Sequence, residues 1–159
     1  MTGNKRDLVI TRVFNAPREL VWRAWTDPRI LKKWWGPRGV TNPTCEWDAR
    51  PGGKINIVML AGKELGNFAG QKWPMNGTFR EVTPQSRLVY TSNALDDIKD
   101  VLIETEVTID FEDLRGKTKM RLHIVVTKAD EKKAAFALQG MEVGWNQQID
   151  KLNEELVNS

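Results

Sequence analysis

The spacing of apolar residues changes near residue 130, and this change most constrains the fold. Between residues 44 and 127 apolar and polar side chains alternate with a period of two, which is typical of antiparallel strands with one buried face. Between residues 131 and 157 apolar residues recur at steps of three and four, which predicts one long amphipathic helix. The pattern therefore predicts a strand meander followed by a helix. The expected strands are 44–49, 54–60, 73–82, 87–92, 103–113 and 118–127.

A shorter helical region precedes the meander. Residues 7–14 alternate and are expected to form a first strand. Pro17 lies where the next helix begins, because proline is favoured in the first helical turn. Asp27 and Pro28 begin a second short helix, which ends at Gly36. The sequence thus predicts one strand, two short helices, the meander and the long helix.

These elements fit one domain of the α+β class. The chain has 159 residues, and single domains usually contain on the order of 100 to 150. No linker, internal repeat or low-complexity tract divides it. We expect a single domain over residues 1–159 with an ordered core of about 7–157. Its curved antiparallel sheet of about seven strands must wrap around the long helix to bury both apolar faces.

Composition excludes several classes of protein. The 24 basic and 21 acidic side chains leave a net charge of +3, which is too small to require nucleic acid as a partner. Cys45 is the single cysteine and His123 the single histidine, so neither a disulfide framework nor a transition-metal site is expected. No apolar run is long enough to span a membrane, and the amino terminus does not resemble a signal peptide. We expect a cytoplasmic protein without a metal or cofactor.

Charge is distributed unevenly along the chain. Residues 96–113 contain eight acidic side chains against Lys99 alone, whereas residues 1–55 are basic. Such a dipolar surface either guides a protein partner or reflects ordinary solvation of charged strands. We favour solvation.

Tryptophan is unusually frequent, with seven residues in the chain. Aromatic mass of this kind fills a large core or lines a large pocket. A sheet wrapped around one helix encloses more volume than the helix side chains fill, and methionine suits pockets of irregular shape. We expect a cavity that admits a ligand, with a solid core as the alternative. Its expected lining comprises Trp34 near the rim, Trp47, Ile57, Met59, Met75, Phe79, Tyr90 and Met120 from the strands, and Phe136, Met141 and Trp145 from the helix.

Two points of side-chain geometry stay open at the level of the sequence. Arg80 faces either inward or outward, and an inward Arg80 would favour an anionic headgroup. Trp34 and Trp35 either gate the mouth of the pocket, or Trp34 lies in the core and Trp35 is half-exposed.

Several short motifs, taken in order, resemble a known family. They are RVFNAP at residues 12–17, VWRAWTDP at 21–28, WWGP at 34–37, DARPGG at 48–53, GTFREVTP at 77–84 and GW at 144–145. The ordered set resembles homologues of the carboxy-terminal domain of the activator of heat-shock protein 90 ATPase, and the resemblance covers essentially the whole chain. It implies the helix-grip (START-like) fold of the polyketide cyclase superfamily, in which the long helix lies across a curved sheet above a hydrophobic cavity.

The resemblance implies three functions of different classes. The leading expectation is binding of a hydrophobic or amphipathic small molecule in the cavity. The first alternative is stimulation of the heat-shock protein 90 ATPase, with the chaperone as a protein partner. The second is an enzyme of the cyclase or hydratase kind. We expect no catalytic residues, because Tyr90, Arg80 and Glu81 are the only titratable groups offered near the pocket.

Overall fold

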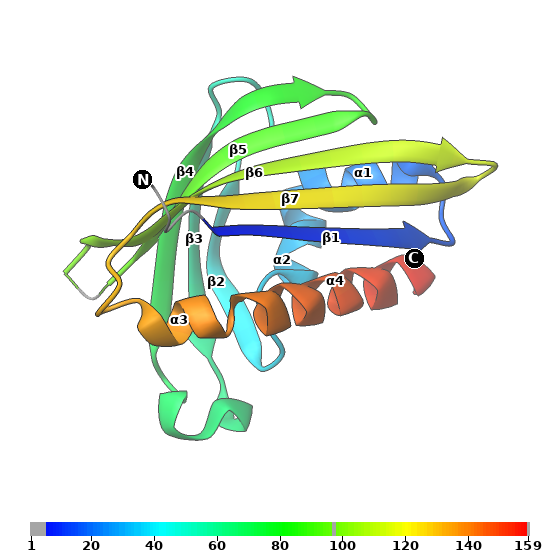
Figure 1. Cartoon of the computed structure of the whole chain (residues 1–159). Helices are drawn as coiled ribbons and strands as arrows, with labels where there is room; N and C mark the ends of the chain where they lie inside the picture. Colours follow the sequence, from blue (N-terminus) through cyan, green and yellow to red (C-terminus); the bar gives the residue numbers. More distant parts are fainter. Residues whose placement is uncertain (1–5, 97, 159) are drawn as a thin grey trace.

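A curved antiparallel sheet and the helix that lies along it make up most of the fold (Figure 1). The structure, a computed structural model, describes residues 6–96 and 98–158, except for the side chains of Arg6 and Phe136. The strand order is β1-β7-β6-β5-β4-β3-β2, so β2 to β7 form a meander and β1 pairs with β7. The strands are β1 (Arg6–Phe14), β2 (Val40–Trp47), β3 (Lys54–Ala61), β4 (Lys72–Thr83), β5 (Arg87–Leu95), β6 (Val101–Leu114) and β7 (Lys117–Ala129). The helices are α1 (Arg18–Thr26), α2 (Pro28–Trp34), the 3₁₀ helix η1 (Lys63–Phe68), α3 (Ala135–Gln139) and α4 (Met141–Val157).

The predicted α+β architecture is confirmed. A strand, two short helices, six strands and a carboxy-terminal helical region follow one another as expected. No helix among the described residues is long and apolar enough to cross a membrane.

The boundary between α1 and α2 depends on one carboxylate. Asp27 donates its backbone N–H to the carbonyl oxygen of Arg23 and so ends α1. Its side chain accepts the N–H of Arg29 at 2.9 Å, which caps the amino terminus of α2. Pro28 begins α2, where its missing N–H costs nothing. Gly36 follows α2 with φ +85°, a conformation that favours glycine, and the chain turns there into β2.

The prediction of one continuous helix over residues 131–157 is wrong. Residues 131–134 form a turn, α3 spans a little over one helical turn, and α4 begins after Gly140. Glycine is about 1 kcal/mol less favourable than alanine inside a helix. The helix is therefore interrupted at Gly140 with little loss of stability. The sequence also gave no sign of η1, which is polar and lies in the loop between β3 and β4.

Apolar side chains form two core clusters on the inner face of the sheet. The main cluster joins the strands to α1, α2 and the buried residues Ile149 and Leu152 of α4. The second cluster is smaller and lies toward α3, with Met141 in contact with both clusters. Its buried members are Ile103, Val126, Ala134 and Leu138.

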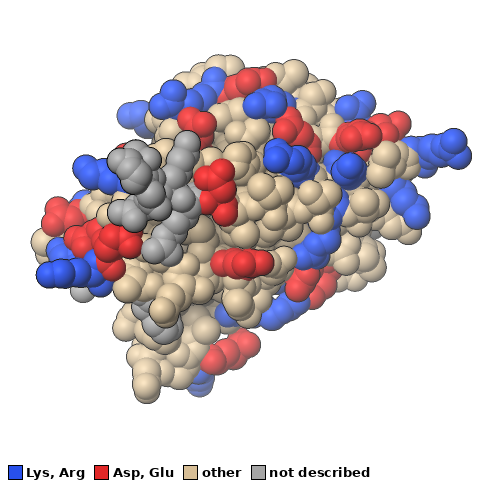
Figure 2. Space-filling model, in the orientation of Figure 1, with Lys and Arg blue, Asp and Glu red and all other residues tan. Residues whose placement is uncertain are grey.

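Charged side chains of both signs are interspersed on the face seen in Figure 2. Much of the acidic charge of residues 96–113 lies on β6, where basic residues of β4 and β5 approach it. Asp110 lies 3.1 Å from Arg87 of β5, and Glu106 lies 4.0 Å from Arg80 of β4. These cross-strand pairs agree with the interpretation of that charge as a solvated strand face.

The backbone of β4 approaches β5 closely at Gly77. A Cβ atom added at Gly77 would overlap the backbone carbonyl oxygen of Thr91, which cannot move without breaking the ladder. We expect Gly77→Ala to lower the free energy of unfolding by about 2 kcal/mol in urea titrations. Gly144→Ala is the matched control, because a Cβ there meets nothing within 4 Å. It should stabilise the chain by roughly 0.5 to 1 kcal/mol, and equal effects of the two substitutions would contradict the strand packing.

Candidate functional site

The residues predicted to line a pocket lie together in the main core. Met59, Met141 and Trp145 are half-buried and contact the buried members of this cluster. Trp34, expected near the rim, is fully buried. Phe136 belongs to α3, but its side chain lies outside the described part of the structure. The buried members of the predicted lining are Trp34, Trp47, Ile57, Met75, Phe79, Tyr90 and Met120.

Aromatic rings fill the centre of this region. The ring of Trp35 lies 5.1 Å from that of Trp47 and 5.9 Å from that of Trp145 on α4, measured between centroids. Trp47 also contacts Phe79 and Tyr90 edge to face, at 5.0 and 5.1 Å. Such distances fall within the favourable range of about 4.5 to 7 Å for aromatic pairs. The aromatic rings therefore connect α4 to the sheet through Trp35.

The position of Trp35 differs from the sequence expectation. Its side chain is 3% exposed, so the alternative with a half-exposed Trp35 is wrong. Trp35 is the carboxy-terminal cap of α2 and has extended backbone angles, which depart from helical periodicity. Helical spacing is therefore no guide to its direction. Trp25 is likewise buried against Trp34, and their ring centroids lie 4.8 Å apart. The apolar face of α1 was the sequence signal from which Trp25 could have been predicted as part of this region.

Three buried hydrogen-bond donors, from α1, β5 and α4, have no partner among the described residues. They are Nε1 of Trp25, Oη of Tyr90 and Nε2 of Gln148. An unpaired buried donor costs about 1 to 3 kcal/mol, so the fold retains these groups at the expense of stability. Burial raises the pKa of the Tyr90 hydroxyl well above its ordinary value, which keeps the hydroxyl protonated and able to donate.

Two of the three donors belong to residues whose rings contact the indole rings of Trp35 or Trp47. The ring of Trp25 lies 6.4 Å from Trp35, and the ring of Tyr90 lies 5.1 Å from Trp47. Gln148 lies on α4, and its amide oxygen accepts the backbone N–H of the residue that follows Trp35, at 2.9 Å. The interior thus combines an apolar aromatic surface with three unpaired donors.

A row of small residues crosses the inner face next to the aromatic rings. Gly77, Ser92 and Thr105 lie opposite one another on β4, β5 and β6. They share the inward parity of Phe79 and Tyr90 along their strands. Ser92 and Thr105 are nevertheless only half-buried, so solvent reaches this part of the inner face. The row lies between the buried residues of the main cluster and those of the second cluster.

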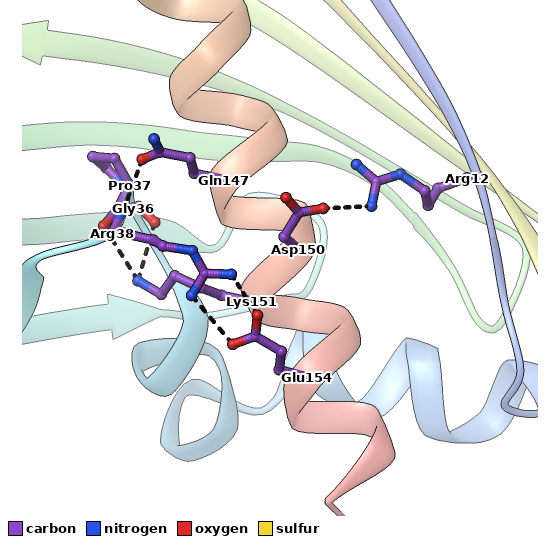
Figure 3. Close-up of polar contacts among 8 residues, drawn as sticks. All are labelled: Arg12, Gly36, Pro37, Arg38, Gln147, Asp150, Lys151 and Glu154. Atoms are coloured by element: carbon purple, nitrogen blue, oxygen red, sulfur yellow. Dashed lines mark hydrogen bonds and ion pairs between the residues drawn. The ribbon is translucent and has the colours of Figure 1, made fainter.

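Polar contacts fix the carboxy-terminal half of α4 against the turn after α2 (Figure 3). Nζ of Lys151 donates to the backbone carbonyl oxygens of residues 35–37 at 3.1 to 3.3 Å. The Arg38 guanidinium pairs with the Glu154 carboxylate, with one Nη–Oε distance of 3.2 Å. The amide oxygen of Gln147 accepts the N–H of Arg38 at 3.1 Å. We call these contacts the polar clamp, and they hold the backbone of the turn that carries Trp35.

The opposite side of α4 is tied to β1. Arg12 donates to Asp150 at 2.8 Å and to Asn146 at 3.3 Å. Figure 3 shows this ion pair and the polar clamp on two sides of the same helix. The contacts all come from residues 146–154, so the second half of α4 is held from both sides.

Two open hollows on the surface lie away from the inner face. One, of about 610 Å³, lies on α1 and α2, and the other, of about 490 Å³, lies beside Trp73 and Leu95. No residue of α4 lines either hollow. Beneath α4, the space in which the sequence predicts a cavity is occupied largely by aromatic rings.

The groups considered for catalysis do not converge. Arg80 is 64% exposed and Glu81 is also exposed, which settles the open parity of β4 in favour of an outward Arg80. Of the three titratable groups considered, Tyr90 alone is buried. His123 is paired with Asp7 of β1 at 3.2 Å. Among the described residues, no group of three or more His, Cys, Asp or Glu side chains is arranged to hold a metal ion.

Residues 15–157 match the model of one protein family, described as Activator of Hsp90 ATPase homolog 1-like protein. The chain belongs to this family. The resemblance drawn from the motifs is therefore confirmed, and membership supports a ligand-binding domain in general. A comparison with curated proteins gave no match.

Solved structures of bacterial proteins share the helix-grip fold over almost the whole chain. A protein from Nitrosomonas europaea is 29% identical, with a TM-score of 0.77, and the match covers 96% of this chain and 94% of that one. A protein from Chromobacterium violaceum is 28% identical, with a TM-score of 0.80 and coverage of 94% and 96%. A protein from Arthrobacter aurescens is 26% identical, with a TM-score of 0.79 and coverage of 96% and 87%.

The polar clamp should make the stability of the folded chain depend on pH. Hydrogen bonding to Arg38 lowers the pKa of the Glu154 carboxyl below its ordinary value of 4.5. The ionised carboxylate therefore stabilises the folded chain above that pH, and this stabilisation is lost as the pH falls through the lowered pKa. We expect Glu154→Gln to lower the urea midpoint at neutral pH and to approach the wild-type midpoint in acid. The control is Glu112→Gln on the exposed end of β6, and an equal pH dependence in both variants would contradict the assignment.

Proposed function

We propose that the protein binds a hydrophobic or amphipathic small molecule between the inner face of the sheet and α4. Family membership supports ligand binding in general. The observation that carries the proposal is the set of three unpartnered donors buried among aromatic rings. In folded proteins almost every buried donor has a partner, so three unpaired donors in one interior favour a ligand that brings an acceptor.

The ligand has an apolar body and at least one acceptor oxygen. Apolar contacts would come from the rings of Trp35, Trp47 and Phe79, and the acceptor would meet Tyr90 Oη and its neighbouring donors. A site that offers donors to an apolar ligand discriminates strongly against the analogue without the acceptor, because its donors then stay unpaired.

The row of small residues supports space for the body of the ligand. Ser92 and Thr105 face inward and are half-buried, and Met59 and Met141 at the margin of the main core are also half-buried. Unbranched methionine side chains adjust to an incoming ligand at low cost. The clamped second half of α4 would stay in place while the apolar contacts of its first half rearrange.

The two other functions stay predictions of the family resemblance. Stimulation of the heat-shock protein 90 ATPase and cyclase or hydratase chemistry both require features beyond the contacts described above. Small-molecule binding is the function that the unpartnered donors favour.

Tyr90→Phe tests the proposal because it should raise the stability of the protein and weaken its binding of a ligand with an acceptor. Removal of an unpartnered hydroxyl should raise the free energy of unfolding by roughly 1 kcal/mol. The same change should weaken binding of 1-acetylnaphthalene by roughly tenfold, because a donor to its carbonyl oxygen is lost. Binding of 1-ethylnaphthalene, which has no acceptor, should be unchanged. Calorimetry and quenching of tryptophan fluorescence measure both probes.

The control is Thr108→Val, which removes a hydroxyl from the outer face of β6. It should leave both probes unaffected. The proposal fails if neither probe binds saturably, or if Tyr90→Phe leaves the preference for the ketone intact.

A further inference from the structure

The solvent face of α1 and α2 carries a concentration of positive charge that the small-molecule site does not use. The hollow of about 610 Å³ on these helices has four cationic side chains and one carboxylate in its lining, a net charge of +3. We call it the basic hollow. Its lining residues are Arg23, Asp27, Arg29, Ile30, Lys32 and Lys33.

One arginine of the basic hollow is held in place by the carboxylate. Nε and Nη2 of Arg29 lie 3.2 and 3.0 Å from the two carboxylate oxygens of Asp27. This bidentate pair fixes the guanidinium plane, and its remaining N–H groups stay available because the side chain is 88% exposed. Arg23, one helical turn before Asp27, lies 3.6 Å from Glu19. The guanidinium of Arg29 is therefore oriented before any partner arrives, whereas Arg23 makes only a longer contact to an exposed carboxylate.

The two lysines of the basic hollow differ from the charges on the strands. Lys32 and Lys33 are exposed in the last turn of α2, and neither forms an ion pair with another described residue in the contacts given above. On the sheet, by contrast, Asp110 and Arg87 neutralise each other across strands. Adjacent cations that have no ion pair among the described residues attract anionic groups and speed their association.

The basic hollow also has an apolar component. Ile30 lies in its lining and is half-buried, between the cationic residues of α2. The carboxylates of Asp27 and Glu19 interrupt the positive charge along α1 and its end. A nucleic-acid strand needs a continuous basic track for its phosphates, so this interruption disfavours it.

We propose that the basic hollow binds an acidic segment of another protein, in which carboxylates flank an apolar side chain. The carboxylates pair with Lys32, Lys33 and the free edge of Arg29, and the apolar side chain contacts Ile30. The proposal is independent of small-molecule binding, because the hollow shares no residue with the predicted pocket lining.

The helices permit a clean test because their two faces have separate roles. Trp25, Leu31 and Trp34 are buried on the inner side, whereas Lys32 and Lys33 are exposed. Substitution of the lysines therefore leaves the core intact, which the tryptophan circular dichroism of each variant verifies.

The experiment measures fluorescence anisotropy of a labelled peptide in which glutamate pairs flank leucines. We expect saturable binding at low salt that weakens at high salt, and a loss of roughly tenfold or more in Lys32→Glu/Lys33→Glu. The affinity of the neutral variant Lys32→Gln/Lys33→Gln for the peptide should lie between those of the wild type and the glutamate variant. The matched control is Lys117→Glu/Lys119→Glu, which makes the same charge change on exposed positions of β7 and should bind like the wild type.

Three outcomes would overturn the inference. The first is equal weakening in the control, which shows attraction to net charge alone. The second is tighter binding of a single-stranded oligonucleotide than of the peptide, which assigns the surface to nucleic acid. The third is unchanged binding when serine replaces leucine in the peptide, which removes the role of Ile30. Binding of the naphthalene probes should be unaffected in every lysine variant, so failure here is distinguishable from failure of the small-molecule proposal.

Discussion

The packing of Trp35 between the sheet and α4 is the contact on which the rest of the structure depends. Its ring meets Trp47 on one side and Trp145 on the other, while Lys151 and Gln147 of the polar clamp hold the adjacent turn. Apolar packing alone would let the helix slide along a smooth aromatic surface. The hydrogen bonds to a fixed stretch of backbone set its position, because they are directional.

The interior of the protein contains both groups that stabilise the fold and groups that lower its stability. Aromatic pairs around Trp47 bury large apolar surfaces and stabilise this region. Tyr90, Trp25 and Gln148 each place an unpaired donor in the same surroundings. A core selected for stability alone would replace these groups with apolar ones, so their retention is consistent with a role in binding.

The short helices α1 and α2 serve two environments at once. Their inner faces supply Trp25 and Trp34 to the core, and their outer faces form the basic hollow. The cap formed by Asp27 links the two, since its carboxylate both begins α2 and orients Arg29. The two short helices therefore separate the surface for which we propose protein recognition from the interior for which we propose ligand binding.

The sequence by itself determined the strands, the two short helices and the family, because alternation, capping residues and ordered motifs are local signals. It also predicted that ten described side chains, such as Phe79 and Met120, line the space inside the sheet, and all ten belong to or pack against the main core. For those on strands, parity decides which face the side chain occupies. Only the tertiary structure decided the burial of Trp35 and which buried donors stay without a partner among the described residues. These features depend on contacts between segments far apart in the chain, which no local pattern contains.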